Sequence, residues 1–199
     1  MRVIAGTARR LLLKAPAGTE TRPTSDKVKE TLFNILMPYI YSDTRFLDLY
    51  SGTGAIGIEA LSRGAEHAVF VERSKEAAAC INYNLNTTHF TDRAQVVNSD
   101  VLTALHRLEG RGGYDIIFMD PPYDKGYERS VLEYLYSSSL VTDDTLIVVE
   151  ASNETDFDYL DDLGYEIVKY KKYKNNCHLF LKIIQTGGND EECDISGQL

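Results

Sequence analysis

Short apolar runs alternate with segments of helical periodicity along most of this chain, and that alternation limits the possible folds more than any other feature. Five runs rich in β-branched and aromatic residues predict strands, at residues 45–50, 67–72, 94–99, 114–119 and 145–151. The segments between and after them predict helices, at residues 55–63, 75–86, 101–109 and 127–138, with a short helix near 157–163. Strands joined by helices pair in parallel, so we expect an α/β fold with helices on both faces of a mostly parallel sheet.

The two ends of the chain predict further elements. Residues before the RPTS segment mix Gly and Pro with a short apolar run and predict a hairpin or an extended arm. At the other end, residues 165–173 and 177–184 predict two strands joined by a KNN turn, an antiparallel hairpin that completes a seven-stranded sheet. Apolar residues at helical spacing follow RPTS and predict a first helix, capped by Thr24 or Ser25: Val28, Leu32, Ile35, Leu36 and Tyr39.

The length indicates one domain, because 199 residues suffice for a single hydrophobic core. We expect this domain over residues 1–185, with a basic arm and helix in residues 1–44 and a Rossmann-like core in residues 45–185. The polar and acidic residues 186–199 predict a disordered tail.

Composition excludes several classes of protein. Hydrophobic residues make up 43% and charged residues 26% of the chain, as in soluble globular proteins. We find no signal-peptide pattern and no apolar run near the ~20 residues that span a bilayer, so we expect no membrane contact. The three cysteines lack C-x-x-C spacing and the four histidines lack ligand spacing. We therefore expect reduced thiols, no metal and a cytoplasmic location.

The net charge of −9 hides an uneven distribution. Residues 1–30 hold seven basic and three acidic side chains, a local charge of +4, and the rest of the chain carries −13. Lys27 and Lys29 are interpreted as solvating the first helix, and the KYKKYKN segment at residues 169–175 as a solvated turn, with RNA contact as its alternative. For contact with RNA phosphates we single out four residues of the arm: Arg9, Arg10, Lys14 and Arg22.

A glycine-rich loop follows the strand at residues 45–50. Gly52, Gly54 and Gly57 form a G-x-G-x-x-G pattern at a helix start, where the backbone can approach a ligand closely. Glu72 ends the next strand, 20 residues after Gly52, where an acid can accept hydrogen bonds from ribose hydroxyls. Together these features predict a nucleoside cofactor.

Asp48 distinguishes between the possible nucleoside cofactors. It lies at the end of the strand at residues 45–50, where its carboxylate would repel the pyrophosphate of a dinucleotide. S-adenosylmethionine carries a sulfonium and an amino group and no phosphate. Asp48, Glu72 and Asp100 follow three successive strands and suit its amino acid, ribose and base in turn. Ser51, Arg73 and Val101, next to these positions, complete the predicted cofactor site.

The strand at residues 114–119 runs into a rigid acidic corner, D-P-P-Y. Two prolines restrict the backbone and remove two N–H donors, so Asp120, the Pro121 carbonyl and the Tyr123 ring are presented together. Pro122 completes the predicted catalytic set. A strand that simply ends in a proline turn is the alternative.

Five sequence blocks are distributed over roughly residues 1–125: RVIAGTARRLLLKAP, TRPTSDKVKETLFNIL, FLDLYSGTGAIGIEALSRGA, FVE and DPPY. In these blocks the chain resembles class I S-adenosylmethionine-dependent methyltransferases, and more closely the ribosomal RNA small-subunit methyltransferase D family. The arm departs from that family in reading GTARRL. The resemblance implies methylation of guanine N2 in 16S rRNA, with free rRNA or the small subunit as partner. We expect the protein to be a monomer.

A guanine amino group is a poor nucleophile, because its lone pair is delocalised into the ring. Hydrogen bonds from its N–H groups to Asp120 and the Pro121 carbonyl would aim the lone pair at the methyl group, while Tyr123 stacks on the base. Adenine N6 in DNA or RNA fits the same corner, so an adenine methyltransferase remains an alternative. A non-catalytic RNA-binding assembly factor is a second alternative, and a dinucleotide oxidoreductase is disfavoured by Asp48.

Overall fold

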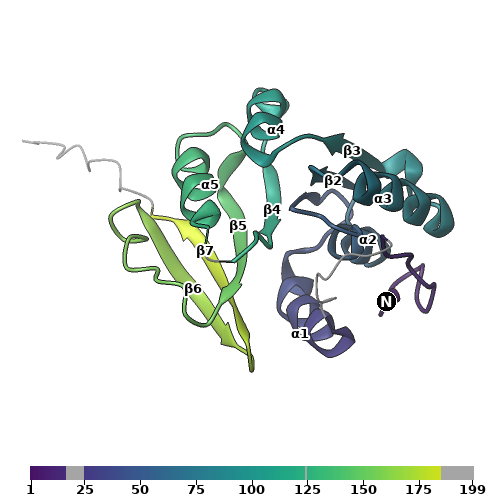
Figure 1. Ribbon diagram of the computed structural model, residues 1–199. Coiled ribbons are helices and arrows are strands. Elements are labelled where there is room, and N and C mark those ends of the chain that lie inside the picture. Colours follow the sequence, from purple (N-terminus) through teal and green to yellow (C-terminus); the bar gives the residue numbers. More distant parts are fainter. Residues whose placement is uncertain (17–24, 124, 185–199) are drawn as a thin grey trace, which may run out of the picture.

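The computed structural model describes residues 1–16, 25–123 and 125–184, which form one seven-stranded sheet with helices on both faces (Figure 1). The strand order is β3-β2-β1-β4-β5-β7-β6. The strands are β1 (Arg45–Leu49), β2 (His67–Glu72), β3 (Ala94–Asn98), β4 (Tyr114–Met119), β5 (Val141–Ser152), β6 (Tyr165–Lys172) and β7 (Asn176–Ile183).

The pairing directions confirm the predicted topology. Strands β3, β2, β1, β4 and β5 pair in parallel with their neighbours, and β7 pairs antiparallel with both β5 and β6. The predicted hairpin therefore places one antiparallel strand in a mostly parallel sheet, and the strand predicted at residues 114–119 has the same bounds in β4. This strand order agrees with the fold that the resemblance to class I methyltransferases implies.

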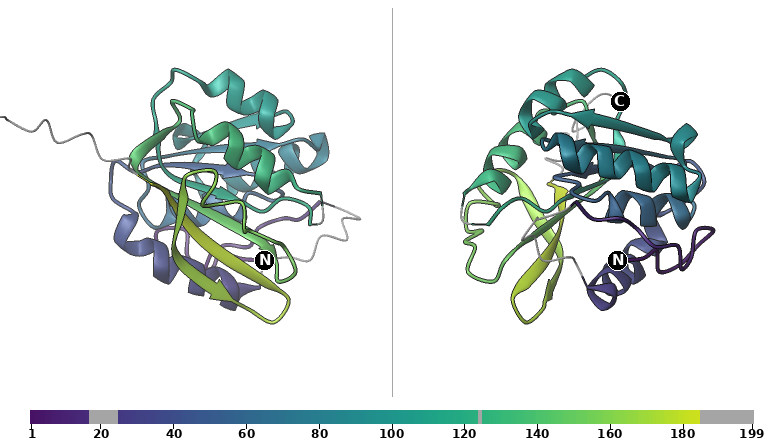
Figure 2. Two further views of the ribbon diagram at one scale, coloured as in Figure 1. Left: turned by 90° about the vertical axis from the view of Figure 1, so that its left-hand side faces the viewer. Right: turned by 45° about the vertical axis from the view of Figure 1, so that its right-hand side comes forward.

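The five α-helices in the described part of the chain divide between the two faces of the sheet, which Figure 2 shows from two further directions. Leu32, Ile58 and Ile81 bring α1, α2 and α3 into one apolar cluster, and Leu105 and Leu132 bring α4 and α5 into the other. Ser25 caps the first helix by accepting a hydrogen bond from the backbone N–H of Val28. The helices are α1 (Asp26–Leu36), α2 (Ala55–Ser62), α3 (Lys75–Thr88), α4 (Val101–Leu108) and α5 (Tyr127–Leu135), with 3-10 turns at Met37–Tyr39 and Thr91–Arg93.

The short helix predicted near 157–163 is wrong, because this segment forms consecutive turns. Its one α-type hydrogen bond joins the Leu163 N–H to the Tyr159 carbonyl. Asp161 and Asp162 would lie at the carboxyl end of such a helix, where acidic side chains oppose the helix dipole. Gly164 then ends the segment with a φ of 77°.

The amino-terminal arm forms the predicted hairpin, held by a buried charge cluster. Arg2 and Leu12 pair as an isolated antiparallel bridge. Glu59, fully buried in α2, accepts hydrogen bonds from the backbone N–H groups of Ile4 (2.8 Å) and Ala5 (3.0 Å). Lys29 lies 3.4 Å from Glu59 and is fully buried, so its interpretation as a solvated residue is wrong. Arg22, Thr24 and the tail at residues 186–199 lie outside the described residues.

Candidate active site

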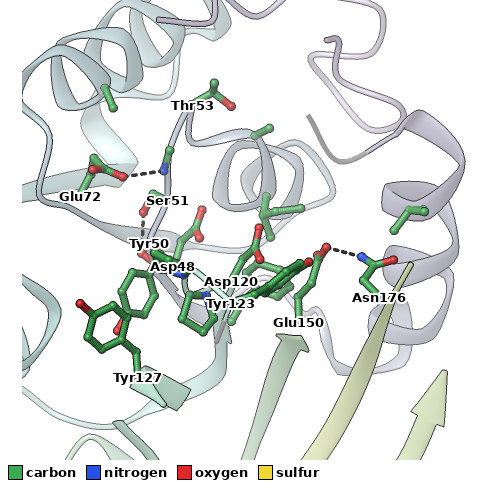
Figure 3. A pocket seen from close by; sticks show the side chains of 18 of the residues that line it. Asp48, Tyr50, Ser51, Thr53, Glu72, Asp120, Tyr123, Tyr127, Glu150 and Asn176 are labelled. Carbon is green, nitrogen blue, oxygen red and sulfur yellow. Dashed lines mark hydrogen bonds between the residues drawn. The ribbon is translucent and has the colours of Figure 1, made fainter. Parts of the chain in front are cut away.

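A large cavity opens at the carboxyl ends of the parallel strands, where ligands bind in open α/β sheets (Figure 3). Its volume is about 1610 Å³, larger than the roughly 300–1,000 Å³ of sites for one small molecule. The cavity therefore has room for a cofactor and a second group. Its lining comes from the ends of β1, β2, β4 and β5, the starts of α1, α4 and α5, and the β6–β7 turn.

The glycine loop shapes one wall of the cavity. Gly54 is the N-cap of α2 and has a φ of 75°, a conformation that other residues rarely adopt. A Cβ atom on Gly57 would lie 2.4 Å from the ring of Phe70, so this glycine lets α2 pack closely on β2. Gly52 and Ser51 line the cavity, whereas Gly54 and Gly57 lie outside its lining and act on its shape.

Glu72 ties the end of β2 to the glycine loop. One carboxylate oxygen accepts a hydrogen bond from the Gly52 N–H at 2.9 Å, and the other accepts one from the Ser74 N–H at 2.7 Å. Each oxygen keeps a second lone pair for a ligand. Glu72 and Arg73 both line the cavity.

Asp48 is a buried acid in the floor of the cavity, with 1% of its surface exposed. Its Oδ2 accepts a hydrogen bond from the Gly57 N–H at 2.9 Å. Burial raises the pKa of the Asp48 carboxyl to about 7, the hydrogen bond from Gly57 opposes the rise, and the charge of Glu72 adds to it. A cationic ligand beside this carboxylate would favour its charged form.

Asp100 has a structural role that the sequence analysis missed. It is the N-cap of α4, and its Oδ1 accepts a hydrogen bond from the Thr103 N–H at 2.9 Å. Hydrogen bonds from Thr103 lower the pKa of Asp100. Asp100 and Val101 both line the cavity.

The D-P-P-Y corner leaves β4 and opens into the same cavity as the glycine loop. Figure 3 shows Asp120 and Tyr123 between Asp48 and Glu150. Burial raises the pKa of Asp120 well above its usual range, and the charges of Glu150 and Asp48 raise it further. All four corner residues line the cavity, and Tyr123 is 39% exposed.

Strand register explains why three acids meet here. Asp48 is the partner of Phe118, and Phe118 is the partner of Val148. Side chains two residues apart on a strand share a face, so Asp120 and Glu150 point to the same face as Asp48. The three carboxylates therefore share one face of the sheet, in or directly after the adjacent strands β1, β4 and β5.

Glu150 belongs to a buried hydrogen-bond network that the sequence analysis missed. It is 4% exposed, and its Oε2 lies 2.9 Å from Nε2 of the fully buried His178. Its Oε1 accepts a hydrogen bond from the Asn176 amide, and the Tyr173 hydroxyl lies 3.2 Å from His178 Nδ1. The only sequence signal was an acid inside the apolar run TLIVVEA.

Aromatic side chains form a second missed feature. Tyr50 and Tyr127 stack with ring centroids 6.4 Å apart and an interplanar angle of 20°. Both line the cavity, one after β1 and one at the start of α5 (Figure 3). The two rings form an apolar part of the cavity wall.

Exposed basic residues also line the cavity. Lys27 comes from α1, and Lys171 and Lys172 come from the end of β6. Residues 171–175 of the KYKKYKN segment line the cavity, and the lysines of this segment are exposed, as a solvated segment requires. Arg9, Arg10 and Lys14 lie on the arm outside the cavity lining, and Lys14 Nζ lies 5.1 Å from the ring centroid of Tyr83.

Among residues 1–16, 25–123 and 125–184, no group of three or more His, Cys, Asp or Glu side chains is placed to hold a metal ion. In that same part of the chain, no helix has the length and apolar character needed to cross a membrane.

Comparisons with known proteins agree with this architecture. A family model described as conserved hypothetical protein 95 matches residues 1–182. The Bacillus subtilis protein YlbH is 44% identical over 157 residues, 78% of this chain and 85% of that protein. "Ribosomal RNA small subunit methyltransferase D" of Haemophilus influenzae is 34% identical, with 88% of this chain and 94% of that protein covered. The solved structure of Escherichia coli yhhF is 32% identical with a TM-score of 0.77, over 92% of this chain and 98% of that one. The chain therefore belongs to the ribosomal RNA small-subunit methyltransferase D family.

Proposed function

We propose that this protein transfers a methyl group from S-adenosylmethionine to the exocyclic N2 of a guanine in small-subunit rRNA, in the cytoplasm. One observation carries the proposal: the D-P-P-Y corner and the glycine loop open into one cavity. Curated relatives named for small-subunit rRNA methylation support the choice of substrate.

The residues present fit S-adenosylmethionine. Asp48 is buried in the floor and would gain from a cationic neighbour, which the ligand's amino group and sulfonium provide. The carboxylate of Glu72, fixed by the Gly52 and Ser74 N–H groups, would accept hydrogen bonds from the ribose hydroxyls, and Asp100 and Val101, which line the same cavity, would contact the base. Arg73 and Ser51 complete this proposed set.

The corner residues would hold the amino group and take its proton. Asp120 and the Pro121 carbonyl accept hydrogen bonds from the two N–H groups, Pro122 keeps the corner rigid, and Tyr123 stacks on the base. When bound, S-adenosylmethionine supplies an electrophilic methyl group, whose bond to sulfur breaks as the bond to N2 forms. Because burial and two acidic neighbours raise its pKa, Asp120 is well suited to receive the proton that N2 loses.

A gene deletion tests this proposal. We expect one N2-methylguanine to disappear from small-subunit rRNA, as mapped by mass spectrometry, and to return with the wild-type gene. Asp120→Ala should not restore it, because the acceptor of the amino proton is lost. Calorimetry should show that the purified variant still binds S-adenosylmethionine, since the proposed cofactor acids follow other strands. Unchanged rRNA with altered adenine methylation would contradict the proposal, and restoration by Asp120→Ala would contradict the catalytic role.

A further inference from the structure

In the reaction described above Glu150 acts only through its effect on the pKa of Asp120, although it lines the same cavity and would lie close to the base. We propose that Glu150 selects guanine by accepting a hydrogen bond from the ring N1–H next to the reacting amino group. This inference rests on the proposed function and names the residue that recognises the base.

The geometry places the two acids side by side. Met119 is the partner of Val149 in the parallel pair of β4 and β5, so Asp120 and Glu150 follow at the same level. Adjacent strands are about 4.8 Å apart, which lets two carboxylates converge on neighbouring atoms of one base. The effect of the Glu150 charge on the pKa of Asp120 agrees with this proximity.

Glu150 is held in place by donors on β7. His178 is its partner in the antiparallel pair, and both that ring and the Asn176 amide contact the carboxylate. A consistent assignment has the Tyr173 hydroxyl donating to Nδ1 of His178 and Nε2–H donating to Glu150. The carboxylate therefore stays fixed, and its remaining lone pairs are available to the cavity.

Two adjacent acceptors match guanine and mismatch adenine. In guanine, the N2 amino group stands next to N1–H, so two neighbouring donors face two neighbouring acids. In adenine, the N6 amino group stands next to N1 without a hydrogen, and its lone pair would face the Glu150 carboxylate. Sites built to bond a substrate N–H discriminate against analogues that lack it by as much as about 10⁴–10⁵-fold.

Substitution of the target base tests this directly. A fragment of small-subunit rRNA is synthesised with guanine or 2-aminopurine at the position found by the deletion experiment. The 2-aminopurine base keeps the 2-amino group but has no hydrogen on N1. We expect the wild-type protein to prefer guanine by at least about 100-fold in kcat/KM. Glu150→Gln should reduce that preference at least tenfold, because its amide can donate to the bare N1.

The control is Glu166→Gln, the same chemical change at an exposed position of β6, which should leave the preference unchanged. The affinities of each protein for the two RNAs, measured alongside, should show the same preference for guanine and the same reduction of it in Glu150→Gln. Equal rates of wild-type protein on both RNAs would overturn the inference, whether or not the variant folds. Equal loss by Glu150→Gln on both RNAs would also overturn it, since a structural role lowers both. In either case methylation of guanine leaves the proposed function standing, whereas no methylation by wild type of the guanine RNA, either free or assembled into small subunits, would overturn both.

Discussion

Asp48 shows at the scale of one residue how a binding site costs stability. The carboxyl would titrate near 3.8 in water, and burial in the folded chain raises its pKa to about 7. The folded state therefore holds an extra proton between these two pH values. The contribution of Asp48 to stability is complete below the lower value and is lost as the pH rises through the upper one.

Asp48→Asn removes the ionisable carboxyl, so the variant should not lose this stability as the pH rises. Its amide oxygen can still accept the hydrogen bond from the Gly57 N–H. We expect the free energy of unfolding to rise by about 1–3 kcal/mol at pH 8 and by less at pH 5. Urea unfolding of the ligand-free protein at both pH values measures this. Calorimetry should show weaker binding of S-adenosylmethionine, because a negative charge is lost. An equal change in stability at both pH values would contradict the account of Asp48.

At the scale of elements, the buried cluster of Glu59, Lys29 and Arg63 joins the arm, α1 and α2. Glu59 lies 3.4 Å from Lys29 and 2.8 Å from Arg63, and all three side chains are at most 7% exposed. Burial lowers the pKa of Lys29, and the charge of Glu59 partly opposes this shift. The ammonium therefore depends on that carboxylate as its partner.

Glu59→Ala should leave Lys29 without this partner and the N–H groups of Ile4 and Ala5 without their acceptor. We expect the free energy of unfolding to fall by about 3–5 kcal/mol. The matched control is Arg129→Ala, which breaks the exposed pair with Glu133 and should cost less than about 1 kcal/mol. Similar losses in the two variants, measured by urea unfolding, would contradict this role for the cluster.

We propose that the arm and the β6–β7 turn are two separate surfaces for RNA phosphates. We expect the pairs Arg9→Ala/Arg10→Ala and Lys171→Ala/Lys172→Ala each to flatten the log–log slope of RNA affinity against salt. The slope should change by about 0.7–0.9 for each phosphate that the variant no longer neutralises. Titrations of small-subunit rRNA at several salt concentrations measure it. Arg107→Ala/Arg129→Ala removes the same charge away from the cavity and should leave the slope close to wild type. An unchanged slope in either double variant would contradict contact between that surface and RNA phosphates.

Element prediction succeeded where local signals were strong. The apolar run of β4 is bounded by Gly113 and the D-P-P corner, so both of its ends were readable. β5 begins four residues earlier than predicted, at Val141, because its first part is polar and is held by pairing with Tyr114 across a register shift. Such pairing depends on tertiary contacts, which no periodicity reveals.

At the scale of the whole molecule, both signs of charge meet at the cavity. Asp48 and Glu150 are buried in its lining, and the exposed side chains of Lys27, Lys171 and Lys172 also line it, although the chain carries −9 overall. Buried acids suit a cationic cofactor, and exposed basic side chains suit a polyanion. Residues just past the strand ends could be predicted, because parallel strands bring their carboxyl ends together. Glu150 and His178 could not, because their contact depends on the register of the terminal hairpin.

The most direct test of the central claim identifies the nucleoside that the purified protein methylates. Small-subunit rRNA, free or in subunits, is taken from the deletion strain and incubated with the protein and labelled S-adenosylmethionine, and is then digested to nucleosides. The account predicts label in N2-methylguanosine, with none when Asp120→Ala replaces the wild-type protein. Label in N6-methyladenosine, or no label in either form of the rRNA, would contradict it.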